Sequence, residues 1–250
     1  MPVKKKTNKA PGSGMTAKQM KRRKPISQEY MLPIEPLTEN QKVMFNAWDE
    51  GKMVYAYGVA GTGKTFVALY KALKEVLDDY SPYEKIYIVR SLVATREIGF
   101  LPGDHEDKSS LYQIPYKNMV QAMFEMPDDN SYEMLYDNLK AQETISFWST
   151  SFIRGTTLDN SIVIIDECQN LNFHELDSII TRVGQDSKII FCGDAAQTDL
   201  IKNNERTGIL DFQKIIMNME EFAMIEFGIE DIVRSGLVRS YLINKINLGL

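Results

Sequence analysis

The sequence predicts an α/β fold in which helices cover both faces of a mostly parallel sheet. From about residue 37 onward, apolar runs that end in Gly, Asp or Arg alternate with longer helix-like segments. These runs are rich in Val, Ile, Phe and Tyr, and most lack the polar–apolar alternation of a half-exposed strand. Both observations are typical of strands that are buried on two sides.

The composition fits one folded domain. The chain has 250 residues, of which 44% are hydrophobic and 25% charged, and this length supports a full core. No stretch approaches the roughly 18 consecutive apolar residues of a membrane span, and the lysine-rich N-terminus lacks the apolar segment of a secretion signal. We therefore expect a cytoplasmic protein. Cys168 and Cys192 lie in apolar runs without CxxC spacing, which predicts buried thiols and neither a disulfide nor a zinc site.

The N-terminal segment differs in charge from the rest of the chain. Residues 1–28 contain nine Lys or Arg and no acidic residue, whereas the other 222 residues carry 20 basic and 34 acidic side chains. Low hydrophobicity predicts a disordered basic arm over residues 1–30, followed by a folded domain over residues 31–250. The arm is either a ligand for nucleic-acid phosphates or a solubilising linker, and charge alone favours neither.

Six apolar runs, each bounded by turn residues, are expected to form the sheet. They are residues 53–58, 85–91, 144–149, 161–166, 188–194 and 223–228. The longer excursion over residues 99–143 holds an expected helix from Leu111 to about Met126. Ligands of open parallel sheets bind at the carboxyl ends of the strands, so functional residues are sought there.

A glycine-rich loop follows the first expected strand. Residues 58–65, GVAGTGKT, fit the pattern GxxxxGK[ST], and the next residues, TFVALYKALKEVL, have apolar side chains at helical spacing. Glycines let successive backbone N–H groups face one anion, and the helix N-terminus adds its positive end. The alternative is a glycine turn before an ordinary helix. The loop residues expected to bind phosphate are Gly58, Val59, Ala60, Gly61, Thr62, Gly63, Lys64 and Thr65.

Within this loop, Lys64 is expected to contact the β- and γ-phosphates of a nucleotide, and Thr65 to offer its hydroxyl to Mg²⁺. A second carboxylate-bearing segment supports this expectation. SIVIIDECQN places Asp166 and Glu167 at the end of a β-branched strand. Asp166 would hold Mg²⁺ through water and Glu167 would polarise the attacking water, so the pair predicts hydrolysis. A strand that merely ends in two carboxylates is the alternative.

The fifth expected strand ends in FCGDAAQTDL. Because the strand ends share one edge of the sheet, Gly193, Asp194 and Gln197 are expected to face the same crevice. Gln197 could then detect the γ-phosphate and pass on its presence.

Six separated segments resemble the PhoH-like family in order and approximate spacing. They are GVAGTGKT, GFLPGD, IRGTTLDNSIVIIDECQN, TRVG, CGDAAQTDL and EDIVRSGLV, and the resemblance runs from about residue 37 to about 240. It implies a RecA-like P-loop NTPase, similar to the first motor domain of superfamily 1 helicases, with ATP and Mg²⁺ as ligands and RNA-directed helicase activity proposed for some relatives. We expect the chain to depart from helicases in lacking a second motor domain after the first.

The resemblance also implies roles outside the loop. Gln41 lies where related ATPases read the adenine edge, although Thr38 and Gln41 also form a capping-box pattern at a helix start. Arg234, in EDIVRSGLV, is the candidate for the arginine that neutralises transition-state charge, with Arg182 and Arg206 as substitutes.

Two further arginines, Arg90 and Arg154, lie at a strand end and before GTTL. They could contact nucleic acid or phosphates, or form ion pairs at the surface.

Two classes of function are open. In the first, ATP hydrolysis drives movement on, or remodelling of, single-stranded RNA or DNA. Neighbouring subunits of a homo-oligomer, a ring of six by resemblance to other RecA-like ATPases, would then replace the missing domain, and Arg234 or a substitute would reach a neighbour's γ-phosphate. In the second, the protein is a nucleotide-dependent switch or scaffold that acts on a protein partner. The basic arm favours the first class, but the acidic body shows no basic stripe.

Overall fold

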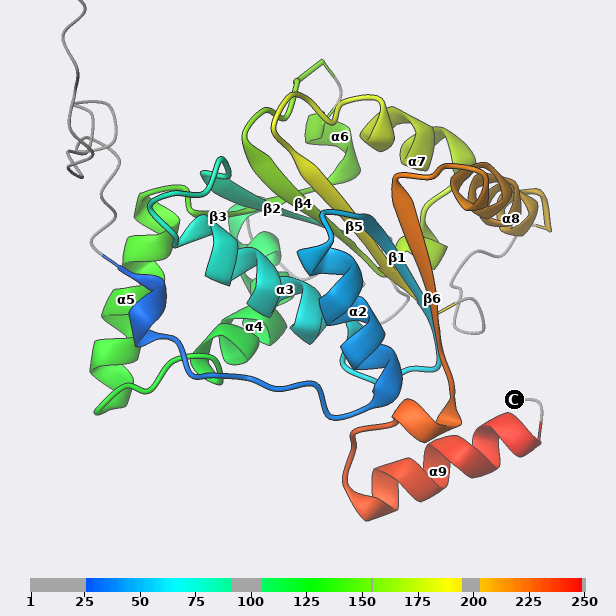
Figure 1. The fold of residues 1–250 in the computed structure, drawn as a ribbon, viewed down its shortest axis with the longest axis horizontal. Coiled ribbons are helices and arrows are strands. Elements are labelled where there is room, and N and C mark those ends of the chain that lie inside the picture. Colours follow the sequence, from blue (N-terminus) through cyan, green and yellow to red (C-terminus); the bar gives the residue numbers. More distant parts are fainter. Residues whose placement is uncertain (1–25, 91–104, 154, 195–202, 249–250) are drawn as a thin grey trace, which may run out of the picture.

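The computed structural model describes residues 26–90, 105–153, 155–194 and 203–248, and the side chains of 105–111, 151–152 and 203–207 are not described. Its centre is a six-stranded sheet with strand order β3-β2-β4-β5-β1-β6, in which every neighbouring pair is parallel (Figure 1). The strands are β1 (Met53–Gly58), β2 (Lys85–Arg90), β3 (Ile145–Trp148), β4 (Ser161–Asp166), β5 (Lys188–Gly193) and β6 (Phe222–Phe227). All six predicted strands are confirmed, each within one residue at either end.

Helices cover both faces of the sheet, as the sequence predicts (Figure 1). One layer holds α2 (Glu39–Asp49), α3 (Lys64–Val76), α4 (His105–Gln121) and α5 (Asp129–Ala141), and the other holds α6 (Thr150–Ile153), α7 (Phe173–Ile180) and α8 (Asn203–Met217). Strand β4 shows why both are needed. Ile162 and Ile164 pack into the first layer, whereas Val163 and Ile165 pack into the second. A strand that is buried on two sides has no polar face to expose, which explains its uninterrupted apolar run.

The order of the strands positions the site. Strand β5 lies between β1 and β4, so one strand separates the end of β1 from the end of β4. Because all strands are parallel, the loop after β1 and the Asp–Glu pair after β4 open at the same edge of the sheet.

Helix α4 confirms the expected helix in the excursion but begins and ends earlier than predicted. It covers His105–Gln121, against the predicted 111–126. Met123 and Phe124 are buried in the turn after the helix. Because these two residues are apolar, the sequence pattern predicted that the helix would continue through them. They are buried without being helical, since a turn can also place apolar side chains in the core. Residues 99–104, the GFLPGD segment, lie outside the described residues.

Residues at the end of the predicted arm belong to the folded part. Ile26 is buried, Gln28–Tyr30 form the 3-10 turn η1, and Leu32 N donates to Met123 O at 2.8 Å. The apolar side chain of Ile26 packs into the core on the side of the sheet that α2, α3, α4 and α5 cover. This packing makes the segment part of the folded domain. Residues 1–25 lie outside the described residues.

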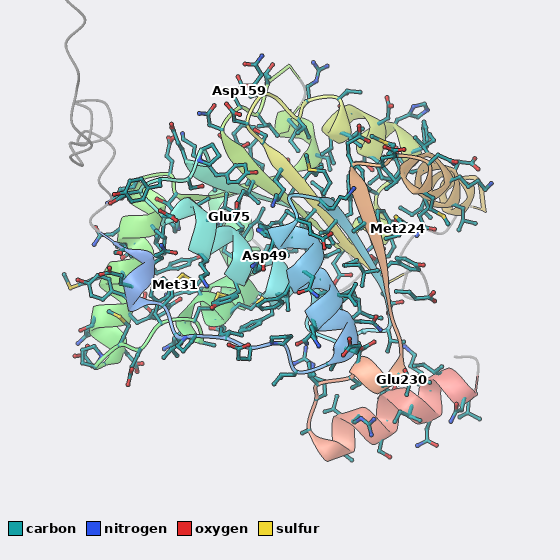
Figure 2. All side chains as sticks on the ribbon, viewed as in Figure 1. Met31, Asp49, Glu75, Asp159, Met224 and Glu230 are labelled. Atoms are coloured by element: carbon teal, nitrogen blue, oxygen red, sulfur yellow. The ribbon has the colours of Figure 1, made fainter. Side chains whose placement is uncertain are left out.

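Buried lysines join the helices of the first layer to the sheet. Lys188 of β5 lies 3.6 Å from a carboxylate oxygen of Glu75 in α3, and Lys71 of α3 contacts Asp49 at the end of α2. Figure 2 labels both acidic partners, Asp49 and Glu75. Burial lowers the pKa of Lys188, and the neighbouring Glu75 opposes this effect. These pairs lie at the end of the sheet where β5 begins, away from the site.

The chain ends in α9 (Gly236–Asn247), which follows the 3-10 turn η4 (Ile229–Asp231). Helix α9 lies beyond the end of β6, apart from the two helical layers (Figure 1). It has no buried residue. Among the described helices, none is long and apolar enough to cross a membrane.

Candidate active site

Residues 58–65 leave β1 and enter α3 directly, as the sequence predicts. Gly61 and Gly63 have φ angles of 77° and 84°, a region that glycine adopts without strain. Gly63 is the N-cap of α3, a helix of 13 residues, and the first N–H groups of a helix lack intrahelical acceptors. Together with the positive end of the helix, these donors form an arrangement that suits an anion, and the expected binding of phosphate stays a prediction.

A cavity of about 300 Å³ opens over the loop. Its walls come from the loop, the start of α3, α4, the ends of β2, β4 and β5, and the segment after η4. The lining residues are Ala60, Gly61, Thr62, Gly63, Lys64, Thr65, Phe66, Arg90, Pro115, Met119, Asp166, Glu167, Cys192, Gly193, Asp194 and Arg234. One cavity therefore holds residues that lie far apart in the sequence, such as Lys64, Asp166 and Arg234. The sequence analysis assigned these residues to one site.

The side chain of Lys64 is buried at the base of this cavity, with the residue 8% exposed. Its ammonium donates to Gly58 O at 3.0 Å, Val59 O at 2.7 Å and Thr62 Oγ1 at 3.3 Å. All three acceptors are uncharged. Burial lowers the pKa of Lys64, and the nearby carboxylates oppose this effect. Because a buried charge is costly without a counter-charge in close contact, an anion in the cavity would stabilise the loop.

Thr65 and Asp166 lie side by side on one wall of the cavity. Thr65 Oγ1 donates to Asp166 Oδ1 at 2.7 Å, which joins the start of α3 to the end of β4. A hydroxyl and a carboxylate supply the hard oxygen ligands that Mg²⁺ requires, with water completing its shell. The donor set fits the metal-binding role expected of these two residues, and that role stays a prediction.

The second oxygen of Asp166 is bound by a residue that sequence reasoning missed. Tyr116 of α4 donates its hydroxyl to Asp166 Oδ2 at 2.6 Å. Burial and the neighbouring Asp166 raise the pKa of Tyr116, so the hydroxyl keeps its proton at neutral pH. The two residues are 50 positions apart, and no motif in the sequence connects them.

Glu167 follows β4 with a left-handed backbone, φ 52° and ψ 43°. This conformation is strained for a residue other than glycine, and such strain is found preferentially at active sites. Glu167 Oε2 accepts a hydrogen bond from Gln169 Nε2 at 2.6 Å. Gln169 Oε1 in turn accepts from the backbone N–H of Asp194 at 3.0 Å. One buried amide therefore connects the ends of β4 and β5. Sequence reasoning missed Gln169, although a polar residue just past a buried strand end was a signal.

Arg90 ends β2 and pairs with Asp166 in the register of the sheet. Its Nη2 lies 3.9 Å from Glu167 Oε1. Burial lowers the pKa of Arg90, but Tyr116, Asp166 and Glu167 outweigh this effect and raise the pKa overall. Arg90 thus supplies a permanent positive charge to the cavity wall beside the Asp–Glu pair. Its expected contact with phosphates or nucleic acid stays a prediction.

Gln41 of α2 lies beneath the loop and is 4% exposed. Its Nε2 donates to Thr62 O at 2.9 Å and its Oε1 accepts from Leu37 N at 2.8 Å. Thr38 also caps α2 by accepting from Gln41 N at 3.3 Å. Of the two hydrogen bonds of a capping box, the one from the backbone N–H of Gln41 to the Thr38 hydroxyl is therefore present. The carboxamide of Gln41 binds the loop instead of the backbone N–H of Thr38. A carboxamide has one further N–H and one further lone pair available, and the expected contact with adenine stays a prediction.

Arg234 lies over the loop of its own chain. A β-carbon added to Gly61 would come within 2.9 Å of Arg234 Cγ, and Val233 N donates to Gly61 O at 3.0 Å. The side chain of Arg234 is exposed and lines the cavity. This position favours action on a nucleotide of the same chain, whereas the sequence-based expectation placed it at a neighbour's γ-phosphate.

Other expected residues are placed elsewhere or not described. Gln197 and Arg154 lie outside the described residues, and so does the side chain of Arg206. Arg182 does not line the cavity. Its Nε is buried and has no hydrogen-bond partner among the described residues. Of the two candidates whose side chains the structure describes, Arg234 lines the cavity and Arg182 does not.

The chain matches one family model over most of its length. The model, described as PhoH-like protein, matches residues 33–244. A PhoH-like protein of Mycobacterium leprae is 31% identical over 206 residues, which cover 82% of this chain and 56% of the relative. A PhoH-like protein of Bacillus subtilis is 32% identical over 210 residues, which cover 80% and 60%. The chain thus spans less than two thirds of the length of these relatives.

Among solved structures, the large terminase of a thermophilic bacteriophage aligns with a TM-score of 0.47 and 11% sequence identity. The alignment covers 83% of this chain and 50% of the terminase.

Proposed function

Because the chain belongs to the PhoH-like protein family, we propose that it binds ATP together with Mg²⁺, hydrolyses it, and couples hydrolysis to the binding, translocation or remodelling of single-stranded RNA or DNA. The observation that supports this most directly is the shared cavity. A phosphate loop with its buried Lys64, the Thr65–Asp166 pair and a strained Glu167 all line it. These are the parts that phosphoryl transfer to water requires.

The loop and Lys64 form the phosphate-binding part. The N–H groups at the start of α3 would bind phosphate oxygens, and Lys64 would exchange its bonds to Gly58 O and Val59 O for bonds to the β- and γ-phosphates. This exchange replaces neutral acceptors by charged ones, and charge-assisted hydrogen bonds are the stronger kind. Arg234, above the loop, would neutralise charge that develops on the transferred group.

Thr65, Asp166 and Glu167 form the hydrolytic part. Thr65 and Asp166 would hold Mg²⁺, which neutralises charge on the phosphate oxygens when it is bound. Glu167 would orient the attacking water and accept its proton. Gln169 holds one carboxylate oxygen of Glu167, so the carboxylate is aimed before the nucleotide arrives.

Two substitutions separate binding from hydrolysis. Lys64→Ala should weaken ATP binding about 10- to 100-fold, since hydrogen bonds to charged groups contribute about 1.5–3 kcal/mol. Glu167→Gln should keep the affinity and lower turnover about 10²- to 10⁴-fold, because it removes the proton acceptor. Equilibrium binding of a fluorescent ATP analogue and a phosphate-release assay measure the two effects.

Lys74→Ala is the matched control, because Lys74 lies on the same helix with an exposed side chain. It should leave both measurements unchanged. Hydrolysis at the unmodified rate by Glu167→Gln would show that the assignment of the catalytic base is wrong.

The nucleic-acid part of the proposal rests on the basic arm. Deleting residues 1–25 removes all nine positive charges of the arm and keeps the buried Ile26, so the slope of log affinity against log salt for single-stranded RNA or DNA should become shallower. ATP turnover without polymer should stay unchanged. Stimulation of turnover by the polymer would support the coupling. Equal turnover with and without polymer, together with equal salt slopes, would favour a nucleotide-dependent switch acting on a protein.

A further inference from the structure

We infer that Tyr116 is a positioning residue of the metal site: its hydroxyl holds the Asp166 carboxylate in the orientation that binds the divalent cation accompanying the nucleotide. The inference rests on the proposed function, since it concerns the metal of that reaction. Its basis is a hydrogen bond of 2.6 Å from the Tyr116 hydroxyl to Asp166 Oδ2. Asp166 Oδ1, on the other side of the carboxylate, accepts from Thr65.

The tyrosine is held firmly enough to position its partner. Tyr116 is 2% exposed, and its ring packs against Phe147 of β3 with centroids 5.4 Å apart. Two neighbours of Tyr116 on α4 line the cavity itself: Pro115, which precedes it, and Met119, which lies about one helical turn after it. The hydroxyl therefore approaches Asp166 from a packed wall of the site, and a rotation of the ring would disturb the core around it.

The two donors to Asp166 behave differently when a cation binds. A cation held by Thr65 and Asp166 Oδ1 competes with the hydrogen bond between these residues, because the cation and the hydroxyl proton seek the same lone pairs. The bond from Tyr116 reaches the opposite oxygen, Oδ2. It can persist and keep the plane of the carboxylate fixed. When a residue that hydrogen-bonds to a metal ligand is replaced, metal affinity or activity typically falls about 10- to 100-fold.

Tyr116 brings a third part of the chain to the metal site. It lies on α4, in the segment between β2 and β3, outside the phosphate loop and the Asp–Glu motif. The metal site is therefore completed by an element that the nucleotide motifs do not contain.

The test compares Tyr116→Phe with the unmodified chain. This change removes the hydroxyl and keeps the ring, so we expect the fold to be retained, as thermal unfolding followed by circular dichroism will show. Manganese replaces magnesium, and electron paramagnetic resonance of free Mn²⁺ measures its binding in the presence of a non-hydrolysable ATP analogue. We expect the dissociation constant of Mn²⁺ to rise about 10-fold or more. Affinity for the analogue in EDTA should change less than about twofold, because the loop contacts are untouched.

Tyr136→Phe is the control. Tyr136 of α5 is also a buried tyrosine, and its hydroxyl has no hydrogen-bond partner among the described residues. Its loss should change neither affinity.

The outcomes separate this inference from the proposed function. If the unmodified chain bound no nucleotide, the proposed function would fail, and the inference with it. If the unmodified chain bound nucleotide and Mn²⁺ and Tyr116→Phe bound Mn²⁺ equally well, the inference alone would be overturned. A parallel loss of metal and metal-free nucleotide affinity would also overturn it, since that pattern indicates general damage to the site.

Discussion

Gln41 shows how a single side chain can support the phosphate loop and keep further hydrogen-bonding groups available. Its carboxamide connects Thr62 O in the loop to Leu37 N ahead of α2. A β-carbon added to Gly63 would come within 2.9 Å of Gln41 Nε2, so the amide lies directly against the turn that begins α3. Any motion of Gln41 on binding adenine would therefore be transmitted to the loop.

Replacement of Gln41 by Ala separates these two roles. The substitution leaves Thr62 O and Leu37 N without their partner, and an unsatisfied buried polar group costs about 1–3 kcal/mol. We expect a loss of that size in the free energy of unfolding, measured by urea denaturation. If Gln41 also contacts adenine, the affinity for ATP should fall more than the affinity for GTP. An equal fall for both nucleotides would restrict Gln41 to its structural role.

Glu167 has a strained, left-handed backbone conformation, and contacts with two neighbouring side chains hold its carboxylate in place. Gln169 and Arg90 lie on either side of its carboxylate. Among the described residues other than glycine, Glu143, Asn160 and Asp186 also have positive φ angles, and only Glu167 of the four lines the cavity. The fold thus stabilises a geometry that the local chain disfavours.

At the scale of elements, the loop is held by the end of β6 and by the segment that follows it. Val59 N donates to Phe227 O at 2.9 Å, and Val233 N donates to Gly61 O at 3.0 Å. Leu242 of α9 also lies close to Gly61. The start and the middle of the loop are therefore fixed by contacts with the C-terminal part of the chain.

This close approach requires a glycine at the end of β1. Gly58 has φ 112°, and a β-carbon added there would lie 2.2 Å from Phe227 O. Gly58→Ala should therefore separate β1 from β6 and destabilise the fold by more than about 1 kcal/mol. It should also weaken nucleotide binding, because Lys64 is hydrogen-bonded to Gly58 O. Urea denaturation and binding of an ATP analogue measure the two effects.

Gly51, at the turn before β1, provides the matched comparison. Its φ is 80°, but an added β-carbon would have no atom within 4 Å. Gly51→Ala should cost about 1–2 kcal/mol from backbone strain alone and leave nucleotide binding intact. Loss of binding in both variants would argue against a specific role of the β1–β6 approach.

At the scale of the whole molecule, the position of Arg234 bears on whether one chain forms a complete site. Self-association into a ring was expected because a neighbour would supply this arginine. In the structure Arg234 instead lines the cavity of its own chain. One chain therefore brings the loop, the Asp–Glu pair and an arginine together, and self-association stays a prediction that sedimentation of the full chain can measure.

Mixing two inactive variants distinguishes the arrangements. Arg234→Ala should lower turnover by up to about 10³- to 10⁵-fold if the arginine acts on the transition state. If Arg234 serves its own chain, a mixture of Glu167→Gln and Arg234→Ala chains should stay inactive. In a shared site, some interfaces would join an intact Glu167 to an intact Arg234, and partial recovery would contradict action within one chain. Exchange of subunits is confirmed beforehand with differently labelled chains.

The sequence by itself determined the six strands, the phosphate loop and the Asp–Glu pair. Each is a local pattern: a buried parallel strand is apolar without interruption, and a phosphate loop needs glycines, a lysine and a hydroxyl at fixed spacing. Only the tertiary structure decided which residues support them. Tyr116 reaches Asp166 from 50 positions away, and Gln41 reaches Thr62 from 21 positions away. Arg234 lies over its own loop because β6 runs beside β1. Such contacts depend on the order of strands and the packing of helices, which bring together segments that no local pattern connects.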